Sequence, residues 1–180
     1  MRKYSITNLM VLTITTLYFV FDSDKERYFY KFALIKESIN QPSDIYRFFT
    51  VIILHGNITH LLFNMLAFYQ LGNVIEERVG RYRFIIVTLI TTLFASITSF
   101  NFMSQYGASI GASGMVFGLM GYFYKIYREY NVSSLSMNVT IALNMALPLF
   151  IDNIDYRAHL GGFISGIILY KIIERKDKEK

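Results

Sequence analysis

Long apolar runs separated by short charged stretches are the feature that most constrains this chain. A helix that crosses a bilayer needs roughly 17–25 mostly apolar residues. Six runs meet or approach that length, at residues 6–21, 58–75, 84–103, 110–127, 135–151 and 158–173. Lipid offers the backbone no hydrogen-bond partner, and the alternating pattern of barrel strands is absent, so these runs should be helices. The sequence therefore predicts an all-α membrane protein with six transmembrane helices, folded as a single domain over residues 1–180.

The charged residues fit this prediction. They make up 17% of the 180 residues and lie mainly between the apolar runs, whereas soluble domains carry about 25%. The net charge of +5 does not indicate nucleic-acid binding, because the basic residues flank apolar runs as they do in cytoplasmic loops. The positive-inside rule places both termini in the cytoplasm. The chain has no cysteine, which excludes disulfides and thiolate metal ligands.

Two N-terminal segments carry expectations of their own. The first run follows Arg2 and Lys3 as the core of a signal peptide does, but no small-residue cleavage site follows it, so we expect a retained span. Residues 22–47 form a mixed-charge external segment that is long for a connection in a compact domain. Its aromatic and apolar residues predict short amphipathic helices at the membrane interface.

Ser113 stands in the sequence Gly111-Ala112-Ser113-Gly114, near the start of the fourth run. Small residues let membrane helices pack closely, and a buried serine often bonds a backbone carbonyl, so packing alone would explain most membrane serines of this kind. A helix from Ser113 to Arg128 has about 16 residues and a length of roughly 24 Å, shorter than a hydrocarbon core of roughly 30 Å. We therefore expect a short central fourth helix whose first residue lies below the outer surface, in a cavity that admits water.

Two stripes of small residues connect Ser113 with His159. They recur at helical spacing in the fourth and sixth runs, as Gly114, Gly118 and Gly121, and as Ala158, Gly162 and Gly166. Each stripe lets its helix approach a neighbour closely. If the stripes face each other, the Ser113 hydroxyl and the His159 imidazole meet as nucleophile and general base. A structural hydrogen bond to a neighbouring helix is the alternative role for this histidine.

The second run begins with further polar residues. His60 and Asn64 are four residues apart and share one helix face. Both can donate hydrogen bonds to the oxyanion of an acyl-transfer intermediate, as can the free N–H of Ser113 at a helix start. His55 lies in the approach to this helix, where it could anchor a loop or take part in catalysis.

Taken in order, these motifs resemble those of the rhomboid family of intramembrane serine proteases, over nearly the whole chain. The nucleophile motif corresponds to residues 111–114, and the last-helix pattern to Ala158, His159, Gly162 and Gly166. The second-helix signature corresponds to His55, His60 and Asn64, and a glutamate–arginine–glycine motif that should tie down the cytoplasmic end of this helix to Glu76, Arg78 and Gly80. An aromatic–arginine pair, with tryptophan in many members, corresponds to Tyr46 and Arg47. Any one motif is weak, but five in sequence are specific.

The resemblance implies a six-helix rhomboid bundle with an interfacial first external loop. It also implies an endopeptidase that cleaves single-span membrane proteins within or near the outer part of their transmembrane segments. Ser113 is then the nucleophile, His159 the general base, and His60, Asn64 and the Ser113 N–H the oxyanion site. Supporting positions are His55, Gly111, Gly114 and Phe117, the last often a tyrosine that packs on the catalytic histidine.

The same resemblance implies neither cofactor nor metal. The expected partners are transmembrane protein substrates and the lipid bilayer, and the oligomeric state stays open. The expected location is a bacterial plasma membrane, with the active site open to the extracytoplasmic side. Asp155 lies four residues before His159 and could be offered as a triad acid. Because the family works with a dyad, we interpret it as an acid of an external loop.

Three other functions are weighed against this one. A zinc hydrolase with His55, His60 and His159 as ligands lacks two histidines four apart on a helix and a neighbouring glutamate. A non-catalytic relative that binds membrane helices would have lost Ser113 or His159, and both are present. A transporter would show internal repeats, which this sequence lacks.

Overall fold

Each predicted apolar segment overlaps a helix in the structure, a computed structural model that describes residues 5–130, 135–146 and 154–178. These helices are α1 (Ile6–Phe21), α4 (Ile58–Val79), α5 (Arg81–Phe102), α6 (Ser113–Glu129), α7 (Leu135–Ala146) and α8 (Tyr156–Lys178). The helical assignment of the six segments is therefore confirmed, except that Met103 and residues 110–112 lie outside α5 and α6, and that residues 147–151 lie outside the described residues. α4 continues four residues past the predicted end and stops at Gly80, whose φ of 81° suits glycine.

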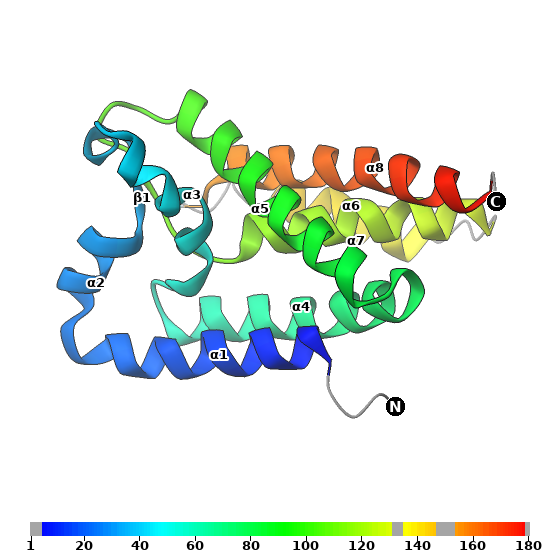
Figure 1. Cartoon of the computed structure of the whole chain (residues 1–180), viewed down its shortest axis with the longest axis horizontal. Coiled ribbons are helices and arrows are strands. Elements are labelled where there is room, and N and C mark those ends of the chain that lie inside the picture. The colour runs from blue at the N-terminus through cyan, green and yellow to red at the C-terminus, as the bar shows by residue number, and fades with distance from the viewer. Residues whose placement is uncertain (1–4, 131–134, 147–153, 179–180) are drawn as a thin grey trace.

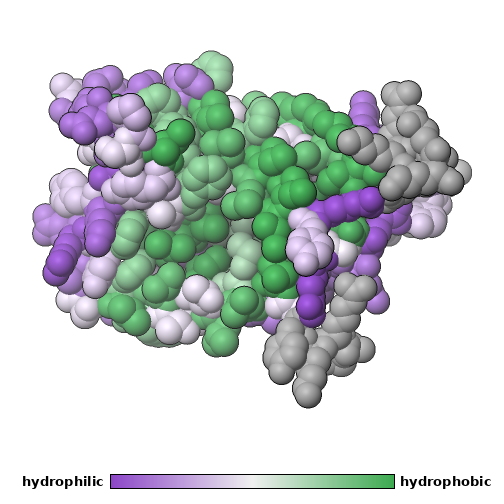
Figure 2. All heavy atoms as spheres, in the orientation of Figure 1, coloured by the Kyte–Doolittle hydropathy of each residue, from purple (hydrophilic) through white to green (hydrophobic). Residues whose placement is uncertain are grey.

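Three helical stretches of the described residues are long and apolar enough to cross a membrane: Ile6–Phe32, Ile58–Val79 and Arg81–Phe102. Figure 2 shows an apolar band across the middle of the molecule, with hydrophilic residues at both ends. On α4, Leu62, Phe63 and Leu66 are 61%, 71% and 56% exposed. Apolar surface this extensive needs an apolar surrounding, so the protein is integral to a membrane. The count of six spans stays a prediction.

The segment between α1 and α4 folds into short elements. They are η1 (Asp22–Asp24), α2 (Lys25–Phe32), β1 (Leu34–Ile35), η2 (Lys36–Ser38), η3 (Pro42–Tyr46), α3 (Arg47–Thr50) and η4 (Val51–Ile53). The predicted short helices are thus present. The sequence did not predict that β1 pairs antiparallel with β2 (Ala108–Ser109), since two residues are too short to show an alternating pattern.

Side chains that bond backbone carbonyls hold this segment together. Arg47 is buried, and its Nη1 donates to the carbonyl of Ala33 at 2.9 Å. The Tyr46 hydroxyl donates to the carbonyl of Lys31 at 2.8 Å. The aromatic–arginine pair noted in the sequence therefore fastens α3 to the end of α2.

The helices lie in a bundle with the short elements at one end (Figure 1). α1 runs beside α4, α5 crosses the bundle, and α6 packs against α4, α5 and α8. We call the end that carries α2, β1 and α3 the loop end. α4, α6 and α8 all begin there, whereas the start of α1 and the end of α8 lie at the opposite end. This common direction puts the first turns of α4, α6 and α8 at one level.

The core lies between α1, α4, α5, α6 and α8, and its largest side chains include Leu61, Phe68, Phe84, Leu119 and Tyr122, each at most 1% exposed. Lipid is as apolar as these side chains, so the gain from burying them is close packing more than removal from water. Tight packing therefore decides which helices pair.

α6 and α8 pack with their backbones in contact. A Cβ on Gly162 would overlap the carbonyl oxygen of Gly114, and one on Gly166 would overlap that of Gly118. Only glycine allows this approach. The α8 stripe therefore faces the backbone of the α6 stripe, whereas a Cβ on Gly114 or Gly118 would meet Ala95 or Thr91 of α5.

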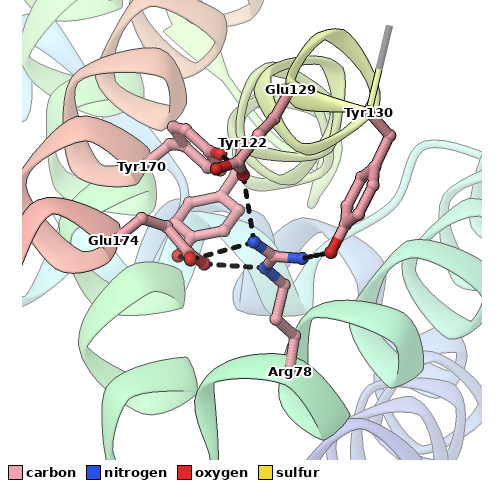
Figure 3. A network of polar contacts seen from close by, with 6 residues as sticks. All are labelled: Arg78, Tyr122, Glu129, Tyr130, Tyr170 and Glu174. Carbon is pink, nitrogen blue, oxygen red and sulfur yellow. Dashed lines mark hydrogen bonds and ion pairs between the residues drawn. The ribbon is translucent and has the colours of Figure 1, made fainter. Parts of the chain in front are cut away.

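At the opposite end, Arg78 of α4 joins α6 to α8 (Figure 3). Its Nε and Nη2 donate to the two carboxylate oxygens of Glu174 on α8, at 2.8 and 3.0 Å. Nη2 also donates to Glu129 on α6 at 3.2 Å, and Nη1 to the hydroxyl of Tyr130 at 3.1 Å. One planar guanidinium thus sets the spacing of three helices.

Glu76 fastens the same end of α4 to the start of α1. Its carboxylate accepts from the Ser5 hydroxyl at 2.7 Å and from the backbone N–H groups of Ile6 and Thr7 at 2.9 Å each. Those N–H groups have no partner within α1, so a side chain from α4 completes the first turn of that helix. The expectation that Glu76 and Arg78 tie down this end of the second long helix is confirmed.

We expect Gly162→Ala to destabilise the protein, because the added methyl group forces α8 away from the Gly114 carbonyl. Overpacking of this kind costs about 1–3 kcal/mol, which lowers the apparent unfolding temperature by roughly 3–10 °C in a chain of this size. Circular dichroism during heating in detergent measures it. The matched control is Gly56→Ala, where a Cβ would lie 3.8 Å from Ile110 Cδ1, an ordinary contact. Equal unfolding temperatures for the two variants would contradict the assigned packing.

Candidate functional site

Ser113 is the first residue of α6, and the turn before it has an unusual backbone. Gly111 has a φ of 112°, a conformation that residues with a Cβ rarely adopt. Its N–H donates to the carbonyl of Val51 at 2.9 Å. Ala112 occupies the N-cap position and has no side-chain acceptor, and no other side chain of the described residues caps the first N–H groups of α6. These donors are the ones that a bound anion or oxyanion could use.

Two histidines brace this turn. A Cβ on Gly111 would lie 2.7 Å from Cε1 of His60, so the imidazole lies directly against the glycine. His55 is buried, and its Nε2 accepts from the N–H of Ala112 at 3.4 Å. Burial lowers the pKa of His55 to about 3, and the nearby His60 acts in the same direction. His55 is therefore neutral at physiological pH and able to accept this bond, as the loop-anchoring interpretation requires.

Asn64 lies one turn after His60 on α4. Its side chain is buried, and its Nδ2 donates to the His60 carbonyl at 2.9 Å. A primary amide has two N–H groups, so one donor remains for another acceptor. Asn57 caps α4 by accepting from the His60 N–H at 2.8 Å. The face predicted for His60 and Asn64 is thus set by a regular, capped helix start.

His159 lies in the first turn of α8, at the level of Ser113. A Cβ on Gly114 would lie 3.4 Å from the Cβ of Ala158, so the neighbours of the two residues touch. The imidazole is buried and stacks on Phe117 of α6, with ring centroids 4.0 Å apart and an interplanar angle of 11°. Among the described residues, His159 Nδ1 has no hydrogen-bond partner, and no hydrogen bond joins the imidazole to Ser113.

Two hollows adjoin this region. The smaller, of about 10 Å³, is lined by Ser113, Gly111, Ser109 and Ala158 among others, and has room for about one water molecule. The larger, of about 420 Å³, lies between the end of α1, α2 and the turn that carries His55. Its lining includes aromatic, aliphatic and charged side chains, among them Ile110, but not Ser113.

The structure thus brings the sequence-selected residues to one end of the bundle. One group consists of His55, His60, Gly111 and Ser113, which are linked by contacts or by nearness in the chain. The adjoining group consists of His159 and Phe117. The sequence missed the contacts of Asp155, which bonds Ser99 and Arg157 and is more than an isolated loop acid. An acidic residue just before an apolar helical segment often caps the helix, so the position of Asp155 in the sequence could have indicated these contacts.

Comparison with known proteins gives a consistent result. The family model described as "Rhomboid domain" matches residues 42–176. The chain is 35% identical over 140 residues to "Rhomboid protease GluP" of Bacillus subtilis (strain 168), covering 75% of this chain and 27% of that protein. It is 35% identical over 144 residues to "RHOMBOID-like protein 1" of Arabidopsis thaliana, covering 76% of this chain and 36% of that protein.

A third relative is "Rhomboid protease GlpG" of Enterobacter sp. (strain 638), 29% identical over 133 residues, covering 70% of this chain and 48% of that protein. The matched region therefore spans less than half the length of each of these three relatives.

Proposed function

This chain belongs to the rhomboid family, and from that premise we propose that it is an intramembrane serine endopeptidase. Its substrates are single-span membrane proteins, cut within or near the outer part of their transmembrane segments. The observation that carries the proposal is that Ser113, the first residue of α6, and His159, in the first turn of α8, lie at one level of two helices whose backbones touch. Two of the relatives are named proteases, and none of these names defines the substrate of this chain.

In the proposed reaction, His159 takes the proton of the Ser113 hydroxyl as Oγ attacks the scissile carbonyl carbon. His159 Nδ1 is buried, which leaves Nε2 to receive the proton. The tetrahedral intermediate collapses to an acyl-enzyme as His159 protonates the leaving amine. Water, activated by the same imidazole, then hydrolyses the ester. The Ser113–His159 hydrogen bond must form during this cycle, and such bonds are often loose before substrate binds.

The oxyanion site in this proposal consists of the Ser113 N–H, His60 and Asn64. No side chain in the described parts of the chain caps α6, which supports the Ser113 N–H as a donor, and the second N–H of the Asn64 amide supports Asn64 as a donor. His60 contacts Gly111, two residues before the nucleophile. His55, bonded to the Ala112 N–H, holds the backbone of this turn in place. Donors fixed before the reaction stabilise developing charge without reorganising.

We propose that the chain forms one membrane domain of six spans with both termini in the cytoplasm, in a bacterial plasma membrane. The loop end then faces outward. α6 has 17 residues, or about 26 Å, which is less than a hydrocarbon core of roughly 30 Å. Its first turn would therefore lie below the outer surface, where substrate enters from lipid and water from outside.

The three-histidine zinc hypothesis gains no support from the geometry. In the part of the chain that the structure describes, no group of three or more His, Cys, Asp or Glu side chains could hold a metal ion. His55 bonds backbone, and His159 stacks on Phe117. A chelator separates the two mechanisms directly.

We expect Ser113→Ala and His159→Ala each to abolish cleavage of a fluorescent transmembrane substrate by the protein reconstituted in liposomes. Each removes one partner of the proton transfer, and losses of several orders of magnitude are usual for such partners. A chelator should leave the rate unchanged. The matched control is Ser165→Ala, a buried serine of α8 whose hydrogen bond within the described residues goes to the Gly162 carbonyl of its own helix. Cleavage that survives Ser113→Ala and stops on adding a chelator would favour the zinc hydrolase.

Asn64→Ala should lower kcat by about 10²–10³-fold if Asn64 is a full oxyanion donor, and less if His60 and the Ser113 N–H compensate. Asn73→Ala on the same helix is the control. Asn73 Nδ2 also donates to the carbonyl four residues earlier, that of Tyr69, at 2.8 Å, but it lies towards the opposite end. Steady-state kinetics of both variants compare the effects. Equal rates for the two would remove Asn64 from the oxyanion site.

A further inference from the structure

Asp155 caps the helix that carries His159. Its carbonyl accepts from the His159 N–H at 3.2 Å, and its Oδ1 accepts from the Ala158 N–H at 3.3 Å. The first hydrogen bond gives the backbone N–H of His159 a partner. The second gives a partner to the Ala158 N–H, which has none within the helix. The side chain of Asp155 therefore fixes where α8 begins and how its first turn is wound.

The same carboxylate reaches across to α5. Ser99 is fully buried in the last turn of α5, and its hydroxyl donates a short hydrogen bond to Oδ2 of Asp155. Arg157 pairs through Nε with Oδ1 at 3.3 Å and donates from Nη1 to the carbonyl of Phe102 at 3.0 Å. Two polar ties thus join the first turn of α8 to the loop end of α5.

Close packing reinforces these ties. A Cβ on Gly161 would overlap Thr98 of α5, so the two helices touch two residues beyond His159. On its other side, the first turn of α8 touches α6 through Ala158 and through the stacked ring of Phe117. The turn that carries the imidazole is consequently held from both sides. No acid of the described residues bonds the imidazole itself.

We propose that Asp155 and Ser99 are positioning residues for His159, an inference that rests on the proposed function. Both carboxylate oxygens are engaged by Ser99, Arg157 and the Ala158 N–H. Asp155 therefore acts on the imidazole through the backbone of α8, and not as the acid of a triad. A displacement of about 1 Å at the reacting groups can cost on the order of 10²-fold in rate. Loss of the tie should accordingly appear in kcat and leave KM unchanged.

The test uses the full chain in liposomes, with variants Asp155→Ala, Asp155→Asn and Ser99→Ala. Two rates are measured: cleavage of the fluorescent substrate, resolved into kcat and KM, and labelling of Ser113 by a fluorophosphonate probe, which needs no substrate docking. Asn101→Ala is the control on α5, because the bond that Asn101 makes among the described residues goes to the carbonyl of Ile97 in its own helix, at 2.9 Å. Apparent unfolding temperatures identify variants that remain folded.

We expect Asp155→Ala to lower kcat and the labelling rate about 10–10²-fold with KM unchanged. Ser99→Ala keeps the cap. It should lower both rates about 3–10-fold, because the imidazole should then be displaced by less than 1 Å. Asp155→Asn keeps Oδ1 as the acceptor of the cap, and its Nδ2, in place of Oδ2, can donate to the Ser99 hydroxyl, so this variant should stay within about threefold of the parent. Asn101→Ala should match the parent.

Several results would overturn the positioning role. One is an unchanged kcat in Ser99→Ala, which decides the matter even if Asp155→Ala fails to fold. Another is a loss in Asp155→Asn as large as in Asp155→Ala, which would assign the effect to charge. A third is a loss confined to KM. The parent protein tests the proposed function separately. If the parent is labelled and cleaves the substrate, the proposed function stands in each of these cases. If it does neither, the proposed function and the positioning role are both overturned.

Discussion

The direct contact between the backbones of α6 and α8 is the constraint on which the rest of this structure depends. Within lipid, apolar side chains gain little by leaving their surroundings, so helices associate where their atoms can approach most closely. The glycines at positions 121, 162 and 166 allow carbonyl oxygens of one helix to lie where the other would otherwise carry a Cβ. The stacking of His159 on Phe117, and the shared level of Ser113 and His159, both require this separation.

Glycine contacts set the distance between two helices but not their register, because a smooth surface permits sliding. Polar clusters at both ends supply the register. At one end Arg78 bonds Glu129 of α6 and Glu174 of α8, with side-chain exposures between 14% and 26%. At the loop end Asp155 joins α8 to Ser99 of α5. Partly buried ionic groups add little net stability relative to apolar packing, so we interpret these clusters as devices that fix register.

The sequence predicts those parts of the fold that repeat. Apolar runs gave every long helix, and the period of the glycines indicated the close contact between α6 and α8. The pairing of Leu34 with Ser109 and the bond from Ser99 to Asp155 were out of reach, since each joins single residues far apart in the chain with no period to reveal them. The extension of α4 past residue 75 was missed for a related reason. Charged residues at 76–78 end an apolar pattern, yet here Glu76 and Arg78 bond other helices and the helix continues.

In the candidate site, too, the sequence could indicate some residues and not others. Ser113, His159, His60 and Asn64 could be selected because polar residues at helix starts are costly in a membrane and therefore informative. Asp155 could not be assigned, because an acid beside a histidine suggests a triad whether or not it touches the ring. In soluble serine hydrolases the acid orients the imidazole by bonding it. Here a ring stacks on the imidazole from α6, while the acid secures the helix beneath it. Under the proposed mechanism, the orientation of His159 would therefore come from helix packing and not from a hydrogen bond to an acid.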